Sequence, residues 1–431
     1  MRNPCLFNSK LYYVFLHFIV FFYLFSIQFG GMPMNIGTRV VLSIFGLLFL
    51  VLIFIKKGQS FSINRKILSI VMTLFCISFV SFIAVLYNGT KDFEFFFKYQ
   101  VSIILILLAS WFVLKLISYK EERFEFQNII NLIINVALIQ VILSIIMFFY
   151  HPLGDFLNST QVSSDLDLKL LEKTHEFRLV GFGSKFFGSG VINGFALILI
   201  ASILKFDKIS KKNIFRYSLS FLLIFALGMM MARTTLVGAL LAFGILFYPK
   251  RKISIKTFNE IIRFILNILI LPFLFLFVVF FLFPSLKESL ELVFNFGFEL
   301  FINYFDSGNL QSASTNRLGE MYVWPIDAKT YLIGDGLYTD VINEAYYMST
   351  DVGIIRLLYY SGVLGLVLFI FLQMQVMYFS SLNNKNFRLM FIVIFFYFFI
   401  LSFKGFTDLV FLSLLFFFRK TNLISENNSI T

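Results

Sequence analysis

The chain has 431 residues, of which 59% are hydrophobic and 14% are charged, and its formal net charge is +12 at pH 7. A soluble protein of this length needs roughly a quarter of its residues charged to cover its surface, so a soluble class is excluded. The apolar residues occur in long uncharged blocks, such as 11–29, which match the thickness of a bilayer when they are helical. The composition therefore predicts an all-α integral membrane protein.

Hydropathy predicts about twelve transmembrane helices, which form a single polytopic membrane domain over residues 1–431. The first block is long for the apolar region of a signal peptide, and no small-residue cleavage site follows it, so it is interpreted as a true span. In chain order, the predicted spans are 11–29, 38–55, 67–87, 99–118, 128–150, 186–204, 214–232, 234–248, 264–283, 351–379, 387–403 and 405–418.

The distribution of charge predicts the orientation of these spans. With the N-terminus inside, the inner segments and Lys115 hold 23 of the 36 Lys and Arg residues but only 6 of the 24 Asp and Glu residues. This asymmetry follows the positive-inside rule and predicts that both termini are cytoplasmic. The membrane that we expect is a bacterial-type plasma (inner) membrane. The basic charge is thus an orientation signal, and the partner that it indicates is anionic membrane lipid and not nucleic acid.

Two long segments fall on the predicted outer side. They cover residues 151–185 and 284–350, the latter being the large outer loop between the ninth and tenth spans. Loops of this length are usually functional or disordered, and the second one contains Trp324, many Tyr residues and an amphipathic helical pattern after Pro284. The two Cys and three His residues have no metal-ligand spacing, so we expect neither a metal nor another cofactor.

Four arginines on the predicted outer side are the strongest candidates for a functional site. They are Arg178 before the sixth span, Arg233 between the seventh and eighth, Arg317 in the large loop and Arg356 inside the start of the tenth span. An arginine at a span end can snorkel to a lipid headgroup, which is an equally good interpretation for Arg178 or Arg233 taken singly. Together the four predict a recessed anion site, because guanidinium binds phosphate or carboxylate bidentately and stays charged when desolvated.

The segments around these arginines resemble a known family. They read RLVGFGSKFFGSGVINGFA, MARTTLVGALLA, NRLGEMY, YLIGDGLY and TDVGIIRLLYYSGVLGLVLF, in that order along residues 175–372. This succession is similar to the Wzy polymerases of O-antigen and capsular polysaccharide assembly, which share a superfamily with the O-antigen ligases. The first five predicted spans resemble the family only in hydropathy.

The resemblance implies a metal-independent glycosyltransferase that acts on lipid-linked sugars. A growing glycan on undecaprenyl diphosphate would be transferred to a sugar hydroxyl of an incoming lipid-linked repeat unit, and a chain-length regulator is the partner protein expected from the family. The four arginines would bind the diphosphate and stabilise its developing charge. The candidate bases for the attacking hydroxyl are Asp351 first, then Glu344 and His175, with Glu320 behind them.

Other interpretations of these residues stay open. Asp351 can equally be the N-cap of the tenth span, and Glu344 and His175 can be ordinary loop residues. The loop aromatics can stack on sugars, although an interfacial aromatic belt is the favoured interpretation for most of them. The loop aromatics are Tyr322, Trp324, Tyr331, Tyr338, Tyr346 and Tyr347.

Two other functions compete with the polymerase. The ligase is disfavoured because ligases typically carry a His in the large outer loop, whereas residues 284–350 contain none. A flippase or exporter of lipid-linked sugars is placed third, because the two halves of the chain show no paired broken helices. The glycine-flanked motif in the large loop, at Gly334 and Gly336, is predicted to be a turn.

Overall fold

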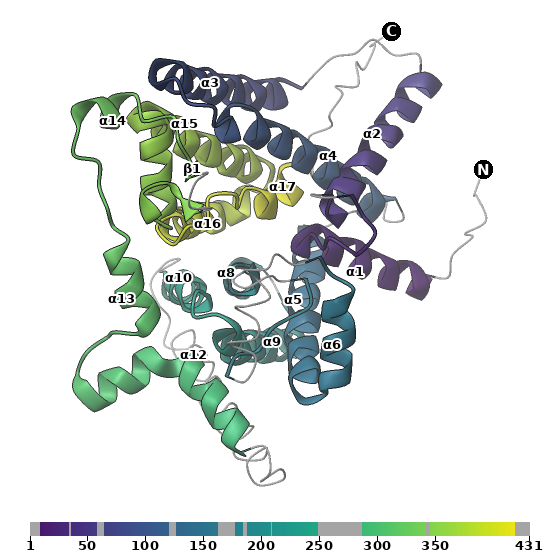
Figure 1. Ribbon diagram of the computed structural model, residues 1–431. Coiled ribbons are helices and arrows are strands. Elements are labelled where there is room, and N and C mark those ends of the chain that lie inside the picture. Colours follow the sequence, from purple (N-terminus) through teal and green to yellow (C-terminus); the bar gives the residue numbers. More distant parts are fainter. Residues whose placement is uncertain are drawn as a thin grey trace. The chain divides into compact units, whose positions relative to one another are not determined.

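The computed structural model is mostly helical and consists of two compact units (Figure 1). One unit takes residues 1–39 and 121–310, and the other takes residues 40–120 and 311–431. The residues that the structure describes are 9–33, 36–57, 64–119, 126–162, 177–183, 188–207, 209–248, 287–340 and 345–418. The single polytopic domain expected from the sequence stays a prediction.

The first unit is built around one deeply buried helix, α8, which packs on α5, α9 and α10. Close contact between α8 and α10 depends on small residues, because a Cβ at Gly238 would overlap the backbone of Gly194. The elements of this unit are α1 (Ser9–Phe25), α5 (Phe126–Phe149), α6 (His151–Ser159), α8 (Gly188–Phe206), α9 (Lys211–Met231), α10 (Thr235–Phe247) and α12 (Lys287–Ser307).

The second unit is organised around its longest helix, α15, which packs on α3, α14, α16 and α17. Its helices are most of α2 (Thr38–Lys57), α3 (Arg65–Asn88), the π-helical η1 (Glu94–Lys98), α4 (Tyr99–Ser118), α13 (Ala313–Glu320), α14 (Ala328–Leu332), the 3-10 turn η3 (Tyr347–Ser349), α15 (Gly353–Asn383), the 3-10 turn η4 (Lys385–Phe387), α16 (Arg388–Ser402) and α17 (Phe411–Phe417). Two short antiparallel strands, β1 (Thr339–Asp340) and β2 (Ala345–Tyr346), pair within it.

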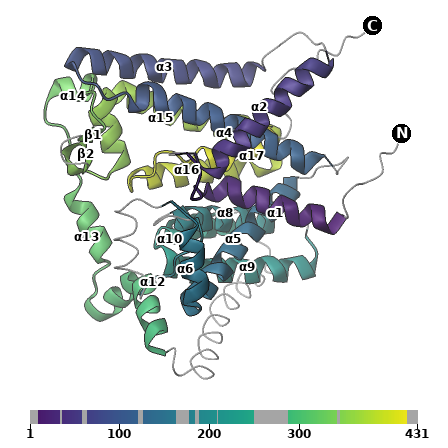
Figure 2. The same cartoon turned by 45° about the vertical axis from the view of Figure 1, so that its right-hand side comes forward.

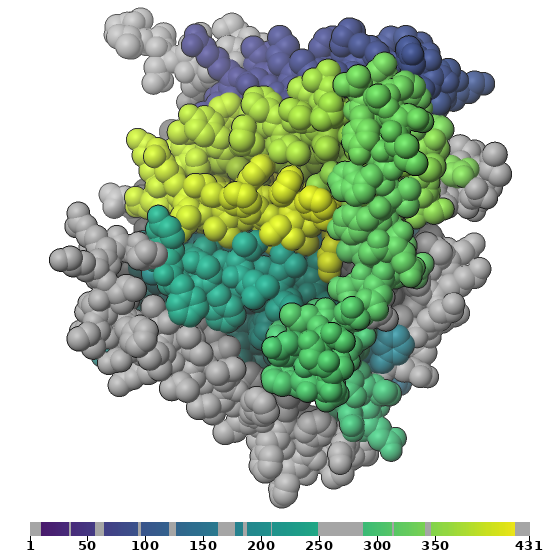
Figure 3. Space-filling model, turned by 90° about the vertical axis from the view of Figure 1, so that its left-hand side faces the viewer, coloured from purple at the N-terminus to yellow at the C-terminus, as the bar shows by residue number. Residues whose placement is uncertain are grey.

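Helix α15 is broken at Ser361 and Gly362, where Gly362 has a φ of 63°. The backbone carbonyls of Tyr359 and Tyr360, just before the break, accept hydrogen bonds from the amides of Asp335 and Gly336. A loop thus satisfies the groups that the break releases from the helix, as buried backbone requires. In the space-filling view, the green segment that includes α14 lies at the surface beside the yellow-green α15 (Figure 3).

Among the described residues, eight helices are long and apolar enough to cross a membrane, as expected for a multi-pass membrane protein. They are α2, α3, α4, α5, α8, α9, α15 and the continuous helix formed by η4 and α16, and α1 and α10 are shorter apolar helices. The predicted span 264–283 lies outside the described residues. The last predicted span, 405–418, contains a helix only over Phe411–Phe417. Gly405 has a φ of 88°, and the residues from Gly405 to the start of this helix are not helical.

The helix predicted after Pro284 is present as α12, which packs on α9. Its Val293, Phe294 and Phe298 join a core cluster with Met230 and Met231 at the end of α9. The amphipathic pattern of this segment is therefore explained by packing within the first unit.

Candidate functional site

In the first unit, Arg178 and Arg233 lie together at the C-terminal end of α9. The Nε of Arg178 donates to the Met231 carbonyl at 2.6 Å, and the Nε of Arg233 donates to the Phe296 carbonyl at 2.9 Å. Both guanidinium groups also lie over the Phe296 ring, at 5.5 and 4.7 Å from its centroid. The Met231 carbonyl at the end of α9, together with the carbonyl and the ring of Phe296 on α12, thus holds the two cations side by side.

Burial and mutual repulsion make these charges costly. Arg178 is 3% exposed, and burial together with the charge of Arg233 lowers its pKa to about 9. Burial also lowers the pKa of Arg233, against the opposing effect of Glu299, with which Arg233 forms an ion pair. Arg178 is therefore still protonated at neutral pH, and an anion placed between it and Arg233 would relieve their repulsion.

In the second unit, Arg356 lies in the first turn of α15 and is 3% exposed. Its guanidinium carbon is 3.8 Å from the centroid of the Tyr346 ring and 4.9 Å from that of Tyr338. One terminal nitrogen donates to the Gly405 carbonyl at 2.9 Å, while the buried Nε has no hydrogen-bond partner among the described residues. The β1–β2 pairing places the two tyrosines next to each other, so the strands build the wall on which the arginine stacks.

Asp351 lies directly before α15, with a carboxylate oxygen 3.8 Å from the terminal nitrogen of Arg356. Partial burial raises the pKa of this carboxyl, and the positive charges of Arg356 and Arg317 oppose the rise. The N-cap of α15 is Val352, so the interpretation of Asp351 as the N-cap is wrong. Its side chain is half exposed, which leaves it accessible from outside the helix bundle.

Arg317 is brought near Asp351 by the packing of α13. This helix begins with a capping box between Ser312 and Thr315, so the residue at which it starts is determined by the local sequence. Leu318 on α13 and Met321 directly after it then pack against Val352 and Ile355, at the N-cap and in the first turn of α15. Arg317 and Glu320 on the same helix are exposed.

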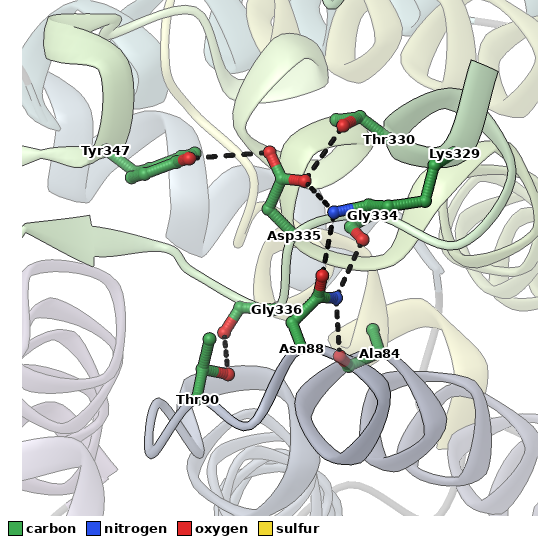
Figure 4. A network of polar contacts seen from close by, with 9 residues as sticks. All are labelled: Ala84, Asn88, Thr90, Lys329, Thr330, Gly334, Asp335, Gly336 and Tyr347. Atoms are coloured by element: carbon green, nitrogen blue, oxygen red, sulfur yellow. Dashed lines mark hydrogen bonds and ion pairs between the residues drawn. The ribbon is translucent and has the colours of Figure 1, made fainter. Parts of the chain in front are cut away.

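A second polar network in this unit is centred on Asp335 (Figure 4). Its carboxylate accepts hydrogen bonds from Lys329 at 2.7 Å, Thr330 at 2.8 Å and Tyr347 at 3.4 Å. Asn88 at the end of α3 accepts from Lys329 at 2.7 Å and donates to the Gly334 carbonyl at 2.9 Å. The network therefore fixes the loop between α14 and β1 to the end of α3.

The glycine motif forms the turn predicted from the sequence, since Gly334 and Gly336 both have positive φ. A Cβ at Gly334 would come within 2.6 Å of the Tyr360 carbonyl, so the turn can approach broken α15 only with glycine there. Sequence reasoning found this turn but missed the roles of Asp335 and Asn88. The only sequence signal for this network was the acidic residue Asp335 between the two turn glycines.

The structure brings together the candidates within each unit. Arg317, Asp351 and Arg356 meet at the start of α15, and Arg178 and Arg233 meet at the end of α9. The single cavity shared by all four arginines stays a prediction, because it joins residues of different units. His175 and Glu344 lie outside the described residues.

The predicted aromatic residues divide into two groups. Tyr338 and Tyr346 contact Arg356, and Tyr347 donates to Asp335, so these three have roles within the loop structure. Tyr322, Trp324 and Tyr331 are exposed.

No cluster of three or more His, Cys, Asp or Glu residues suited to a metal ion occurs in the part of the chain that the structure describes. Searches against protein-family models, curated proteins and solved structures returned no match to the chain.

Proposed function

We propose that this protein is a glycosyltransferase that polymerises lipid-linked oligosaccharide repeat units at the outer face of a bacterial plasma membrane. The growing glycan is transferred from undecaprenyl diphosphate to a sugar hydroxyl of an incoming lipid-linked unit. The observation that carries the proposal is the group at the start of α15, where the Asp351 carboxylate lies 3.8 Å from Arg356 and is also influenced by the charge of Arg317.

This group fits the chemistry of the transfer. Asp351 takes the proton of the attacking sugar hydroxyl, whose oxygen forms a bond to the anomeric carbon of the growing glycan. The bond from that carbon to the diphosphate oxygen breaks, and its electron pair leaves with the diphosphate. A carboxyl with a raised pKa is a better proton acceptor than an ordinary aspartate, and fixed arginines stabilise the negative leaving group.

The rigid setting of Arg356 suits this role. A buried guanidinium held against Tyr346 and the Gly405 carbonyl does not need to reorganise when charge develops on a bound phosphate. In this proposal Arg178 and Arg233 bind a diphosphate of the lipid-linked substrates.

The proposal includes the topology inferred from charge, namely twelve spans, cytoplasmic termini and both arginine groups on the outer side. It also includes a chain-length regulator as a partner protein.

The break in α15 is a feature that transporters use, but here the backbone amides of a loop fill it. For this reason we favour the enzyme over a flippase.

The test is incubation of the purified protein with a lipid-linked repeat unit, followed by separation of the products by size. A ladder of oligomers is expected, and Arg356→Ala and Arg317→Ala should each suppress it. Lys91→Ala, which removes an exposed cation after α3, is the matched control and should leave the ladder intact. A single transfer to a different acceptor would indicate a ligase, and lipid translocation without any product would indicate a flippase.

A further inference from the structure

The segment 322–332, which precedes and includes α14, presents an unusual number of apolar side chains to its surroundings. Ile326 is 96% exposed and Leu332 is 65% exposed. The exposed large hydrophobic residues of the segment are Tyr322, Val323, Trp324, Ile326, Tyr331 and Leu332. Exposing this many apolar side chains to water is unfavourable, so the exposed side chains of this loop indicate an apolar or interfacial environment.

The chain directly after this segment is anchored at one end of a membrane-length helix. Asn88, the last residue of α3, donates to the Gly334 carbonyl, and Thr90 donates to the Gly336 carbonyl at 2.7 Å. Figures 1 and 2 both show α14 beside this end of α3. Because α3 is long and apolar enough to cross a bilayer, its end lies near the level of the lipid headgroups.

Exposed apolar residues continue on the α3 side of the same anchor. Leu86 and Tyr87, directly before Asn88, are 62% and 64% exposed. Phe93 and Phe97 follow shortly after Thr90 and are also exposed. Lipid must cover this end of α3 if the helix spans a membrane, and the segment 322–332 is tied to the same place.

We propose that the segment 322–332 is an interfacial anchor, which lies in the headgroup region of the bilayer and inserts Trp324, Ile326 and Leu332 towards the acyl chains. Lipid is the occupant that fits, since tryptophan, tyrosine and lysine together are typical of the membrane–water interface. Lys329, on the same segment, is 40% exposed, and its amine ties the segment to Asp335 and to Asn88 at the end of α3. The inference depends on membrane insertion of α3 and not on the proposed enzymatic activity.

Trp324 is a built-in reporter, because the chain has only two tryptophans and the other, Trp111, is buried in α4. Trp111→Phe protein would be reconstituted, one copy per nanodisc, in phosphatidylethanolamine and phosphatidylglycerol. Bromine atoms would be carried on the acyl chains either near the headgroup or near the chain end. We expect blue-shifted Trp324 emission, stronger quenching by the shallow bromines than by the deep ones, and protection from aqueous iodide.

Two variants test the origin of the signal. Leu332→Asp should lower the bromine quenching and raise the iodide quenching of Trp324. Leu310→Asp, which changes a leucine that is also 65% exposed but lies outside the segment, should leave both unchanged. If Trp111→Phe does not fold, the difference between the spectra of the wild type and of Trp324→Phe gives the same information.

Strong iodide quenching without bromine quenching would overturn the proposal and show that Trp324 faces water in the isolated protein. The segment would then be a surface for a protein partner. One copy per nanodisc excludes burial against a second copy as the source of protection.

Discussion

Replacing Asp335 by alanine removes the acceptor that connects the loop after α14 to its surroundings. Three donors lose this carboxylate, namely Lys329, Thr330 and Tyr347. We expect the loop between α14 and β1 to open more readily, because the backbone contacts of residues 335 and 336 with α15 would have to hold it without side-chain support.

The size of the effect follows from the burial of each donor. Thr330 is 5% exposed, so leaving its hydroxyl without an acceptor costs about 1–3 kcal/mol. Lys329 is 40% exposed and keeps its hydrogen bond to Asn88, so the lost ion pair contributes less than about 1 kcal/mol. A local destabilisation of about 2 kcal/mol corresponds to a roughly 30-fold larger open population.

Amide hydrogen exchange of peptides that cover residues 335 and 336 measures this opening directly. Asp335→Ala should lower protection roughly 30-fold, while Asp335→Asn, which keeps an acceptor for Thr330, should lower it far less. Asp327→Ala, at the N-cap position of α14, removes an exposed carboxylate whose side chain makes no capping hydrogen bond and should have no effect. Equal effects of the alanine and asparagine variants would refute the reasoning, because the charge and not the buried hydroxyl would then be decisive.

Three further predictions concern the second unit. Gly362→Ala should destabilise the protein by about 1–3 kcal/mol in thermal unfolding, because its φ is positive, whereas Gly244→Ala, with open space at the Cβ, should not. Tyr346→Leu should lower the rate of ladder formation far more than Tyr346→Phe, which keeps the ring under the Arg356 guanidinium and a contact of about 2 kcal/mol. If Asp351 is the base, activity falls as pH drops through its raised pKa. Arg317→Ala removes a charge that lowers this pKa, so the acidic limb of the rate profile should move to higher pH.

The helices were largely predictable because long uncharged apolar blocks leave a membrane chain no alternative to helix. The span predicted at 67–87 corresponds to α3, whose ends are set by the Asn64 N-cap and by Gly89 in the left-handed region. The break at Gly362 could not be predicted, since a single glycine in an apolar run is compatible with a continuous helix. The break depends on hydrogen bonds from a loop that is distant in the sequence, so it is determined by tertiary structure.

The charged site residues were also predictable, because an arginine within an apolar helix is energetically costly and therefore indicates a functional or structural role. In the structure a carboxylate oxygen of Asp351 lies 3.8 Å from Arg356, although the two residues are five positions apart in the chain. Asn88 and Gly334, in contrast, are 246 residues apart, and no local pattern indicates their contact. The tyrosines on Arg356 could be named from the sequence but not assigned to it.

The break in α15 also bears on how the proposed site is held. Arg356 lies on the short helical segment before Ser361, and the carbonyls of Tyr359 and Tyr360 at the end of that segment bind the loop amides. The hydroxyl of Tyr360 also donates to the Asp92 carbonyl, so this segment is tied to the loops at several points. Because the break interrupts the helix, the orientation of Arg356 is set by the loop as well as by the long C-terminal part of α15. Such a fixed charge can stabilise an anionic leaving group without reorganising, which is the property that the proposed transfer requires.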